Sequence, residues 1–328
     1  MIKTVSVAPM MDCTDRHDRF FLRLISKNVM LYTEMVATKS AIHGDRKKIL
    51  SYSPEEKPLA LQVGGSDKKD LSEVAKIAED TGYDEININL GCPSKKVQKN
   101  KFGACLMKEP DLVAECINAM VNSCKIPVTA KTRIGFDDTE DFNYLNNFIN
   151  KIKEAGCKTI ILHARKAMLK GLSPKQNLNI PKINYEMVYA IKKENPDLEI
   201  IINGGITKTD EIKKHLKFCD GVMIGRPIYQ NPYFLTEIEK DIFNSKEIIT
   251  REEIAEKILQ YLEKEVKLGA KVNHIMRHTV GLYHGQIGSK KWKRYLSDNM
   301  MARDSDFKKA KYIMTIVQNN EKANEINL

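Results

Sequence analysis

The sequence predicts an α/β fold in which a (β/α)8 TIM barrel is followed by a C-terminal all-α helical-bundle domain. Short β-rich runs alternate with helical stretches over the first three quarters of the chain, which is typical of parallel βαβ units. The expected strands number eight, more than an open doubly wound sheet usually holds. After residue 244 no strand pattern remains, and apolar residues recur only at helical spacing.

The eight expected strands are spread along the first 243 residues. They cover residues 4–10, 30–36, 59–63, 85–90, 128–133, 159–164, 199–203 and 221–224. The helices expected between them cover residues 67–81, 111–123, 141–155, 185–194 and 209–218. A chain of 328 residues is long enough for this barrel and a second, smaller domain. We therefore expect the barrel domain at residues 1–243.

Residues 244–328 are expected to form the helical domain. Its predicted helices cover residues 251–267, 271–283, 289–300 and 306–318. Thr250 is followed three residues later by Glu253, a capping-box pattern that marks the start of the first helix. The domain boundary follows from the loss of strand patterns in this part of the chain.

The charge balance indicates a polyanionic partner such as nucleic acid. The formal net charge is +10, and the isoelectric point is near 9.0. The stretch 267–311 holds eleven Lys or Arg residues against three acidic ones. Its segment "SKKWKRYL" interleaves Trp292 and Tyr295 with cations, which suits phosphates and exposed bases. The alternative is a solvated helix face whose aromatic side chains lie in the core.

Other bulk properties indicate a cytoplasmic protein. No run of 18 apolar residues exists, and the start "MIKTVSVAPMMD" lacks the apolar region of a signal peptide. The seven cysteines form no CxxC pair and have no histidine at zinc spacing. We therefore expect reduced thiols, no bound metal and no association with a membrane.

Polar and unusual side chains occupy most of the expected strand ends. The ends read "APMMD", "TEMV", "LQVGG", "NLGCPS", "AKTRIG", "LHAR", "INGG" and "MIGR". In a barrel these ends meet around one opening, the barrel mouth, where active sites lie. One polar strand end is unremarkable because it is often only solvated, whereas a set of seven around one ring indicates a ligand site.

A phosphate group is expected at the last two strand ends. Gly204 and Gly205 offer backbone N–H groups with no Cβ in the way. Gly225 and Arg226 add a guanidinium that can hold phosphate oxygens in bidentate fashion. The alternative for the glycines alone is a simple turn.

A planar heteroaromatic ring would suit the remaining polar groups, Gln62, Asn89, Lys131 and His163. Amide groups can bind its carbonyl and N–H edges, and Lys131 suits the negative charge of a reduced flavin. Taken singly, His163 could be a structural histidine and Lys131 could pair with an acid, so the inference depends on the whole set.

Cys92 stands between Gly91 and Pro93 at the expected end of the fourth strand. A thiol near its usual pKa of about 8.5 is mostly protonated at neutral pH and can act as a general acid. No adjacent histidine favours a thiolate. The alternatives are that Cys92 is a small buried hydrophobe, or that Cys105 in "FGACLM" is the acid, although its apolar neighbours favour a core position.

These motifs together resemble the tRNA-dihydrouridine synthases, and in particular their A branch. The resemblance extends over nearly the whole chain and includes "APMMDCTDRHDRFF", "GYDEININLGCPSKKVQKNKFGACLM", "VTAKTRIGFDD", "LHARKAMLKGLSPKQN" and "DGVMIGRPIYQNPY". The pattern Asn-x-Gly-Cys-Pro with a downstream Gly-Ala-Cys is specific to the family, and "HARKA…GLSPK" is more specific still to the branch.

The resemblance implies an FMN-dependent, NADPH-driven reductase that passes hydride from flavin N5 to C6 of a tRNA uracil. It implies that Cys92 protonates C5 and that Asn89 holds the target uridine, chiefly at D-loop position 20 and its neighbour 20a. Residues 1–243 would be the FMN-binding catalytic barrel, and residues 244–328 the tRNA-binding domain of a monomeric protein. The positions that fall on the family's FMN site are Pro9, Met10, Gln62, Lys131, His163, Asn203, Gly204, Gly205, Gly225 and Arg226.

Contacts with the D-loop and elbow of tRNA are expected from Lys175, Lys291 and Arg294, and at position 178. Leu178 departs from the branch pattern, which has a basic side chain there. The resemblance therefore does not decide whether position 178 contacts tRNA. Two other hypotheses share part of these features. One is a barrel flavoenzyme that reduces a small pyrimidine or enone, and the other is an RNA-binding protein without catalysis.

Overall fold

The structure is a computed structural model that describes residues 5–299. The described chain divides into two compact units. The first unit contains residues 5–14 and 29–225, and the second contains residues 15–28 and 226–299. The assignment of FMN binding and catalysis to residues 1–243 and of tRNA binding to residues 244–328 stays a prediction.

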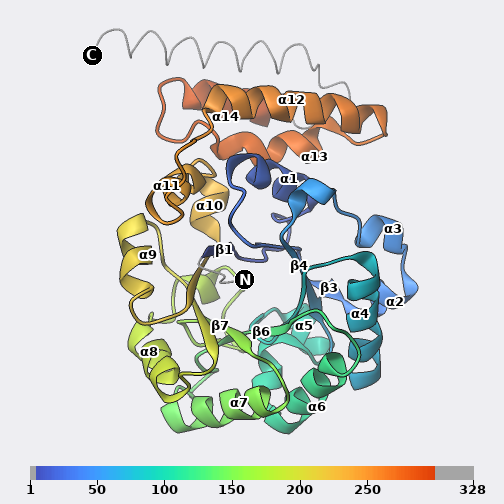
Figure 1. Ribbon diagram of the computed structural model, residues 1–328, viewed down its shortest axis with the longest axis vertical. Helices are drawn as coiled ribbons and strands as arrows, with labels where there is room; N and C mark the ends of the chain where they lie inside the picture. The colour runs from blue at the N-terminus through green and yellow to red at the C-terminus, as the bar shows by residue number, and fades with distance from the viewer. Residues whose placement is uncertain (1–4, 300–328) are drawn as a thin grey trace. The chain divides into compact units, whose positions relative to one another are not determined.

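The first unit is built around a parallel sheet that closes into a barrel (Figure 1). The strand order is β1-β9-β8-β7-β6-β5-β4-β2, and β3 also pairs with β4. Backbone bonds from Met30 N–H to Val5 O (3.2 Å) and from Val7 N–H to Met30 O (2.9 Å) join the two ends of the sheet. The strands are β1 (Val5–Val7), β2 (Leu31–Tyr32), β3 (Val36–Ala37), β4 (Leu59–Gly64), β5 (Glu85–Asn89), β6 (Val128–Arg133), β7 (Thr159–His163), β8 (Glu199–Asn203) and β9 (Gly221–Ile224).

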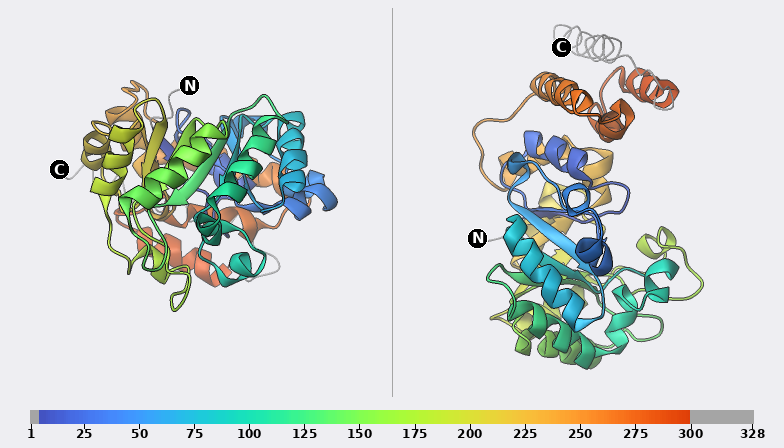
Figure 2. Two further views of the ribbon diagram at one scale, coloured as in Figure 1. Left: turned by 90° about the horizontal axis from the view of Figure 1, so that it is seen from below. Right: turned by 90° about the vertical axis from the view of Figure 1, so that its right-hand side faces the viewer.

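The predicted (β/α)8 barrel is therefore confirmed. The short strands β2 and β3 together occupy the place of the single strand expected at residues 30–36. The long helices surround the strands in all the views (Figures 1 and 2). The helices and 3-10 turns of this unit are α2 (Thr38–His43), α3 (Arg46–Ile49), η1 (Pro54–Glu56), α4 (Lys68–Thr81), α5 (Lys95–Lys99), η2 (Gly103–Lys108), α6 (Pro110–Val121), α7 (Phe142–Glu154), η3 (Gln176–Leu178), α8 (Tyr185–Glu194) and α9 (Thr209–His215).

Local sequence explains where the outer helices begin. The Asp67 carboxylate accepts bonds from the N–H groups of Lys69 (2.8 Å) and Asp70 (3.0 Å), which caps α4. Asp141 caps α7 in the same way through the N–H of Tyr144 (2.8 Å). The apolar stripe of each helix is buried, so burial of one face stabilises the outer layer.

The barrel interior contains an apolar part and a polar part. The apolar cluster consists of Ala8, Met30, Tyr32, Ala60, Ile161, Ile201 and Met223, all at most 6% exposed. On β5 the polar residues Glu85, Asn87 and Asn89 alternate with Ile86 and Ile88. Because side chains of a strand alternate between its faces, the carboxylate and both amides share one face. Their hydrogen bonds to Tyr32, Gln62 and Thr129 place that face inside the barrel.

The second unit is helical and includes one segment from near the start of the chain. α1 (Arg16–Ile25) packs with C-terminal helices, since Phe20 stacks on Tyr261 with ring centroids 3.8 Å apart. The ring Nε2 of His278 lies 3.0 Å from Oδ1 of Asp15, the cap of α1. The other elements are α10 (Arg226–Gln230), α11 (Phe234–Asp241), α12 (Arg251–Lys267), α13 (Val272–Met276), η4 (Arg277–Gly281) and α14 (Ser289–Asn299).

The helical predictions for this part are confirmed at α12 and α14, and the capping box of Thr250 and Glu253 is formed. The single helix expected at 271–283 is wrong, because the chain changes to a 3-10 turn at Arg277. A Cβ on Gly281, the last residue of this turn, would lie 2.5 Å from Gln230 O at the end of α10. The two backbones are therefore in close contact, and the side chains of a continued α-helix would have no room there. The helix expected at 306–318 and the cations Arg303, Lys308, Lys309 and Lys311 lie outside the described residues.

Within residues 5–299, none of the helices has the length and apolar character needed to cross a bilayer.

Candidate active site

The loop after β5 holds the Cys92 thiol in a defined position. Asn89 Oδ1 accepts the backbone N–H groups of Gly91 (3.2 Å) and Cys92 (3.0 Å), which bends the chain directly after the strand. Cys92 is half-buried. Burial raises the pKa of this thiol, and a backbone hydrogen bond from Ser94 and the charges of Arg133 and Lys131 only partly oppose that rise. The thiol is therefore protonated at neutral pH, as a proton donor must be.

The downstream Gly-Ala-Cys motif supports this loop. The N–H of Ala104 donates to Cys92 O (2.9 Å). Gly103 has φ +78°, and a Cβ there would lie 2.6 Å from Cys92 O. Cys105 is half-buried and its thiol donates to Phe102 O (3.1 Å), so the expectation that it is a core residue is wrong.

Lys131 in β6 is a half-buried residue whose amine makes no ion pair among the described residues. Its Nζ donates to Asn203 Oδ1 (3.0 Å), and Asn203 Nδ2 donates to Met223 O (2.7 Å). Burial, with a smaller contribution from Arg133, lowers the pKa of Lys131 to about 7. A buried ammonium of this kind would be stabilised by an anionic group brought in by a ligand.

The predicted amide groups lie next to the amine and the thiol. Asn89 is the register partner of Lys131 in the β5–β6 pair, and Asn89 Nδ2 donates to Gln62 Oε1 (2.9 Å). His163 is the register partner of Asn203 in the β7–β8 pair and is 7% exposed. The barrel mouth thus brings together side chains from β4, β5, β6, β7 and β8.

Glycines make room at the last strand ends. Gly204 and Gly205 have φ +116° and +74°. A Cβ on Gly204 would lie 2.6 Å from the His163 ring, so only glycine lets the turn approach the imidazole. A Cβ on Gly225 would lie 3.4 Å from Met10 Sδ, which shows that the ends of β9 and β1 are adjacent.

The remaining predicted residues follow the same strand ends. Pro9 and Met10, both half-buried, follow β1, and the Met10 N–H donates to Thr14 Oγ1 (3.1 Å). Arg226 is the first residue of α10 and belongs to the second unit, whereas the other predicted mouth residues belong to the first.

A flavin fits the chemistry of this set. The amine that would face a ring's negative charge has a pKa lowered by burial and lacks an acidic partner in residues 5–299. Amide donors and acceptors lie beside it, and residues without a Cβ stand at the last two strand ends, where a phosphate would bind. The residues that would hold the ring are Gln62, Lys131, His163 and Asn203.

Arg133 is a site residue that the sequence reasoning missed. It is 3% exposed, and its guanidinium donates to three backbone carbonyls from two loops. Nε donates to Gly91 O (2.9 Å), and Nη1 donates to Lys166 O (3.1 Å) and Asn177 O (3.3 Å). Its position two residues after Lys131 on the same strand face was the available signal. Arg133 therefore joins the Cys92 loop to the long loop after β7.

The predicted tRNA residues of the first unit lie on that long loop. Lys175 is exposed at the start of η3, and Leu178 is half-buried at its end. Between them Asn177 is fully buried, and its Oδ1 accepts the Met168 N–H (2.7 Å). The loop is thus fixed from inside, while Lys175 faces solvent.

The predicted cations of the second unit lie on α14. Lys291 and Arg294 are exposed, and Arg294 makes a surface ion pair with Asp298 (3.6 Å). The expectation that Trp292 and Tyr295 meet exposed bases is wrong. Trp292 is fully buried, with Nε1 donating to Thr279 O (2.9 Å), and Tyr295 is 8% exposed. Both rings are core residues, because helical spacing turns them away from the cationic face.

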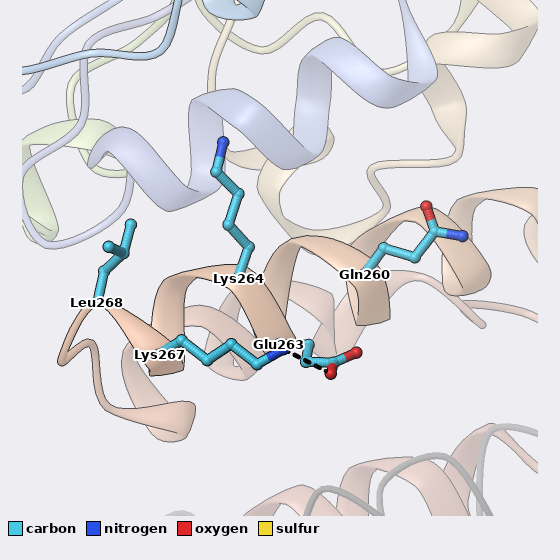
Figure 3. A pocket seen from close by; sticks show the side chains of 5 residues that line it. All are labelled: Gln260, Glu263, Lys264, Lys267 and Leu268. Atoms are coloured by element: carbon cyan, nitrogen blue, oxygen red, sulfur yellow. Dashed lines mark hydrogen bonds and ion pairs between the residues drawn. The ribbon is translucent and has the colours of Figure 1, made fainter.

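A shallow surface depression of about 420 Å³ lies along α12 (Figure 3). Lys267 and Glu263, one turn apart on α12, form an ion pair beside it (3.0 Å). The lining residues are Gln260, Glu263, Lys264, Lys267 and Leu268. This depression has no thiol, histidine or buried charge, so it does not compete with the barrel mouth as an active site.

The fold and the barrel mouth define a class of protein: a TIM-barrel enzyme. Its site contains both a protonated thiol and an amine whose pKa is lowered by burial. The profile of the family described as dihydrouridine synthase (Dus) matches residues 6–319. The chain belongs to the dihydrouridine synthase family.

Three relatives illustrate the similarity, and each is named tRNA-dihydrouridine(20/20a) synthase. The protein of Shewanella oneidensis is 50% identical over 298 residues, covering 90% of this chain and 89% of the relative. That of Synechocystis sp. is 50% identical over 301 residues, covering 92% and 90%. That of Escherichia coli K12 is 48% identical over 314 residues, covering 95% and 91%.

Proposed function

We propose that this protein is a tRNA-dihydrouridine(20/20a) synthase, which uses FMN and NADPH to reduce the C5–C6 double bond of D-loop uridines. The observation that carries the proposal is the half-buried thiol of Cys92, whose pKa burial raises and which is held just after β5 in a chain half identical to relatives of that name.

Bound FMN would supply the hydride that C6 receives, and NADPH would renew it. The protein supplies the proton and the positions of the reacting groups. Cys92 Sγ gives its proton to C5, which requires a thiol that stays protonated near neutral pH, and burial raises its pKa accordingly. Asn89 holds the pyrimidine. Its side chain also accepts the Cys92 N–H, so the base that Asn89 binds lies beside the thiol.

The flavin would be held by residues from several strand ends. Lys131 places an ammonium beside the polar edge of the ring, where it can stabilise negative charge. Gln62, His163 and Asn203 would bind ring atoms, and Pro9 and Met10 would form an apolar wall. The phosphate would bind at Gly204, Gly205, Gly225 and Arg226.

The tRNA would be bound mainly through its phosphates. Lys175, Lys291 and Arg294 are exposed cations, and the chain carries a net charge of +10. Leu178 would contribute only an apolar contact to the D-loop or elbow. We assign flavin binding and catalysis to residues 1–243 and tRNA binding to residues 244–328, in a monomer that acts in the cytoplasm.

The proposal is tested by mapping dihydrouridine in tRNA from cells that lack this protein. We expect dihydrouridine to be absent at positions 20 and 20a and to return with the wild-type gene but not with a Cys92→Ala gene. Unchanged dihydrouridine at both positions in the deletion strain would refute the proposed function.

A further inference from the structure

A chain of hydrogen bonds descends from the Cys92 loop into the barrel. The Cys92 N–H donates to Asn89 Oδ1 (3.0 Å), and Asn89 Nδ2 donates to Gln62 Oε1 (2.9 Å). Gln62 Nε2 then donates to Asn87 Oδ1 (2.9 Å). Gln62 is 1% exposed and Asn87 is fully buried, so bulk water cannot reach these bonds.

The chain ends on a carboxyl group deeper in the barrel. Asn87 Nδ2 donates to Thr129 Oγ1 (2.8 Å), and the Thr129 hydroxyl donates to Glu85 Oε1 (2.5 Å). Tyr32 Oη donates to the same oxygen (2.8 Å). Burial and the Glu85 charge raise the pKa of Tyr32 well above its usual value, so its hydroxyl keeps its proton and remains a donor.

The two ends of the chain fix the direction of every bond between them. A backbone N–H can only donate, so the top of the chain requires an oxygen at Asn89. Glu85 Oε1 accepts from two hydroxyls, so the bottom of the chain requires donors directed toward it. The amide groups of Asn89, Gln62 and Asn87 therefore each have one orientation consistent with both ends.

This direction determines what Asn89 can offer a ligand. Its Oδ1 accepts two backbone N–H groups, from Gly91 and Cys92, which uses both lone pairs. Its Nδ2 has two hydrogens and gives one to Gln62. The remaining hydrogen makes Asn89 a donor, which pairs with a carbonyl oxygen and not with an amino group.

From this geometry we infer that Asn87 is a positioning residue that selects uridine over cytidine. Asn87 holds Gln62, and Gln62 holds Asn89, so that Asn89 turns an N–H toward the pyrimidine. At C4 uracil presents a carbonyl oxygen and cytosine an amino group, whereas both bases carry a carbonyl oxygen at C2. The inference therefore places the free N–H of Asn89 at C4, where a donor disfavours the amino group. The inference rests on the proposed function, in which Asn89 holds the target base.

Two substitutions at Asn87 separate this role from a merely structural one. Asn87→Leu has a side chain of similar size and removes both hydrogen bonds. Asn87→Asp keeps an acceptor for Gln62 Nε2. The matched control is Asn195→Leu, because Asn195 is 2% exposed and donates to Asn146 Oδ1 (2.9 Å) and Ile191 O (3.1 Å), away from the strand ends.

A substitution at the top of the chain tests its direction. In Asn89→Asp the side chain has only acceptors, so Gln62 must turn its Nε2 toward position 89. Asn87 must then turn in the same way, and the Thr129 hydroxyl can donate to Asn87 instead of Glu85. The group offered to the base becomes an acceptor, which pairs with the amino group of cytosine.

The experiment measures dihydrouridine and dihydrocytidine formation on tRNA carrying uridine or cytidine at position 20. FMN affinity of the apo-proteins and melting temperatures are measured alongside. We expect Asn87→Leu to lower kcat on uridine about tenfold at unchanged KM for tRNA, and to weaken FMN binding through Gln62. Asn87→Asp should recover most of the loss, and Asn195→Leu should lower only the melting temperature. Asn89→Asp should lower the uridine-to-cytidine ratio of kcat/KM at least tenfold.

The possible outcomes are distinct. A wild-type protein that forms no dihydrouridine in tRNA refutes the proposed function and this inference with it. An active wild type with wild-type kcat and FMN affinity in Asn87→Leu, or an equal loss of kcat in Asn195→Leu, refutes the inference alone. If Asn87→Leu does not fold, the ratio measured with Asn89→Asp decides, and an unchanged ratio refutes the inference.

Discussion

Lys131 Nζ and Asn203 Oδ1 are joined by a 3.0 Å hydrogen bond between β6 and β8, and no ion pair accompanies it among residues 5–299. Burial lowers the pKa of Lys131 from 10.5 to about 7. Below pH 7 both the folded and unfolded chains carry the charge, and folding must bury it. Between pH 7 and 10.5 the unfolded chain binds a proton that the folded chain has released, so this residue's contribution to stability rises with pH.

Lys131→Met should therefore stabilise the apo-protein most at low pH. We expect a gain of about 3 kcal/mol at pH 6 that shrinks steadily above pH 7. Urea unfolding of both apo-proteins at pH 6 and pH 9 measures the difference. An equal difference at the two pH values would mean that the amine is not held at a lowered pKa.

Cys92 should react slowly with alkylating reagents near neutral pH. Burial raises the pKa of its thiol, and only the thiolate is nucleophilic. We expect iodoacetamide to modify Cys92 more slowly than a free thiol at pH 8, with a pH midpoint above that of a free thiol, and tRNA reduction to fall over the same pH range. Mass spectrometry of a time course gives the rate. Fast modification at pH 7 would exclude a protonated thiol.

Gly103→Ala should disturb the Cys92 loop. The new Cβ would lie 2.6 Å from Cys92 O and from Val97 Cγ1, in addition to the strain of φ +78°. Gly171→Ala is the matched control, because φ is +80° there and no atom lies within 4 Å of the added Cβ. We expect a loss of unfolding free energy of about 3 kcal/mol at Gly103 and about 1 kcal/mol at Gly171. Similar losses of unfolding free energy at both positions would show that the backbone strain at positive φ, and not the contact with Cys92 O, causes the destabilisation.

Reversing the charge of Lys291 and Arg294 should weaken tRNA binding. Both cations are exposed on α14 and can neutralise phosphates, so their replacement by Glu should raise the KM for tRNA about tenfold. Flavin reduction by NADPH should not change. Lys76→Glu, on an exposed position of α4, is the control. Equal tRNA affinity and an equal salt dependence in the double variant and the wild type would remove α14 from the interface.

The barrel could be predicted because strand patterns and helix spacing are local properties. Gln62, Asn89, Lys131 and His163 are polar residues at strand ends, and barrel geometry alone brings such ends to one opening. The pairing of α1 with the C-terminal helices depends on contacts such as Asp15 with His278, which no local pattern encodes.

Other features depended on side-chain direction. Trp292 lies among cations in the sequence but turns to the core, since neighbouring helix positions face different sides. The polar chain through Asn87 had a sequence signal, because Glu85, Asn87 and Asn89 alternate on a strand that a barrel buries on both faces. Arg133 could not be predicted to join two loops, because its partners are backbone carbonyls that any residue carries.

The central claim, that Cys92 gives its proton to the uridine, is tested most directly in a single turnover. Wild-type protein and the Cys92→Ala variant, both with FMN bound and reduced in advance by NADPH, are mixed with unmodified tRNA in the absence of oxygen. We expect the flavin of the wild type to become oxidised as dihydrouridine forms, and the flavin of the variant to stay reduced. Dihydrouridine formation by the variant at the wild-type rate would contradict the account.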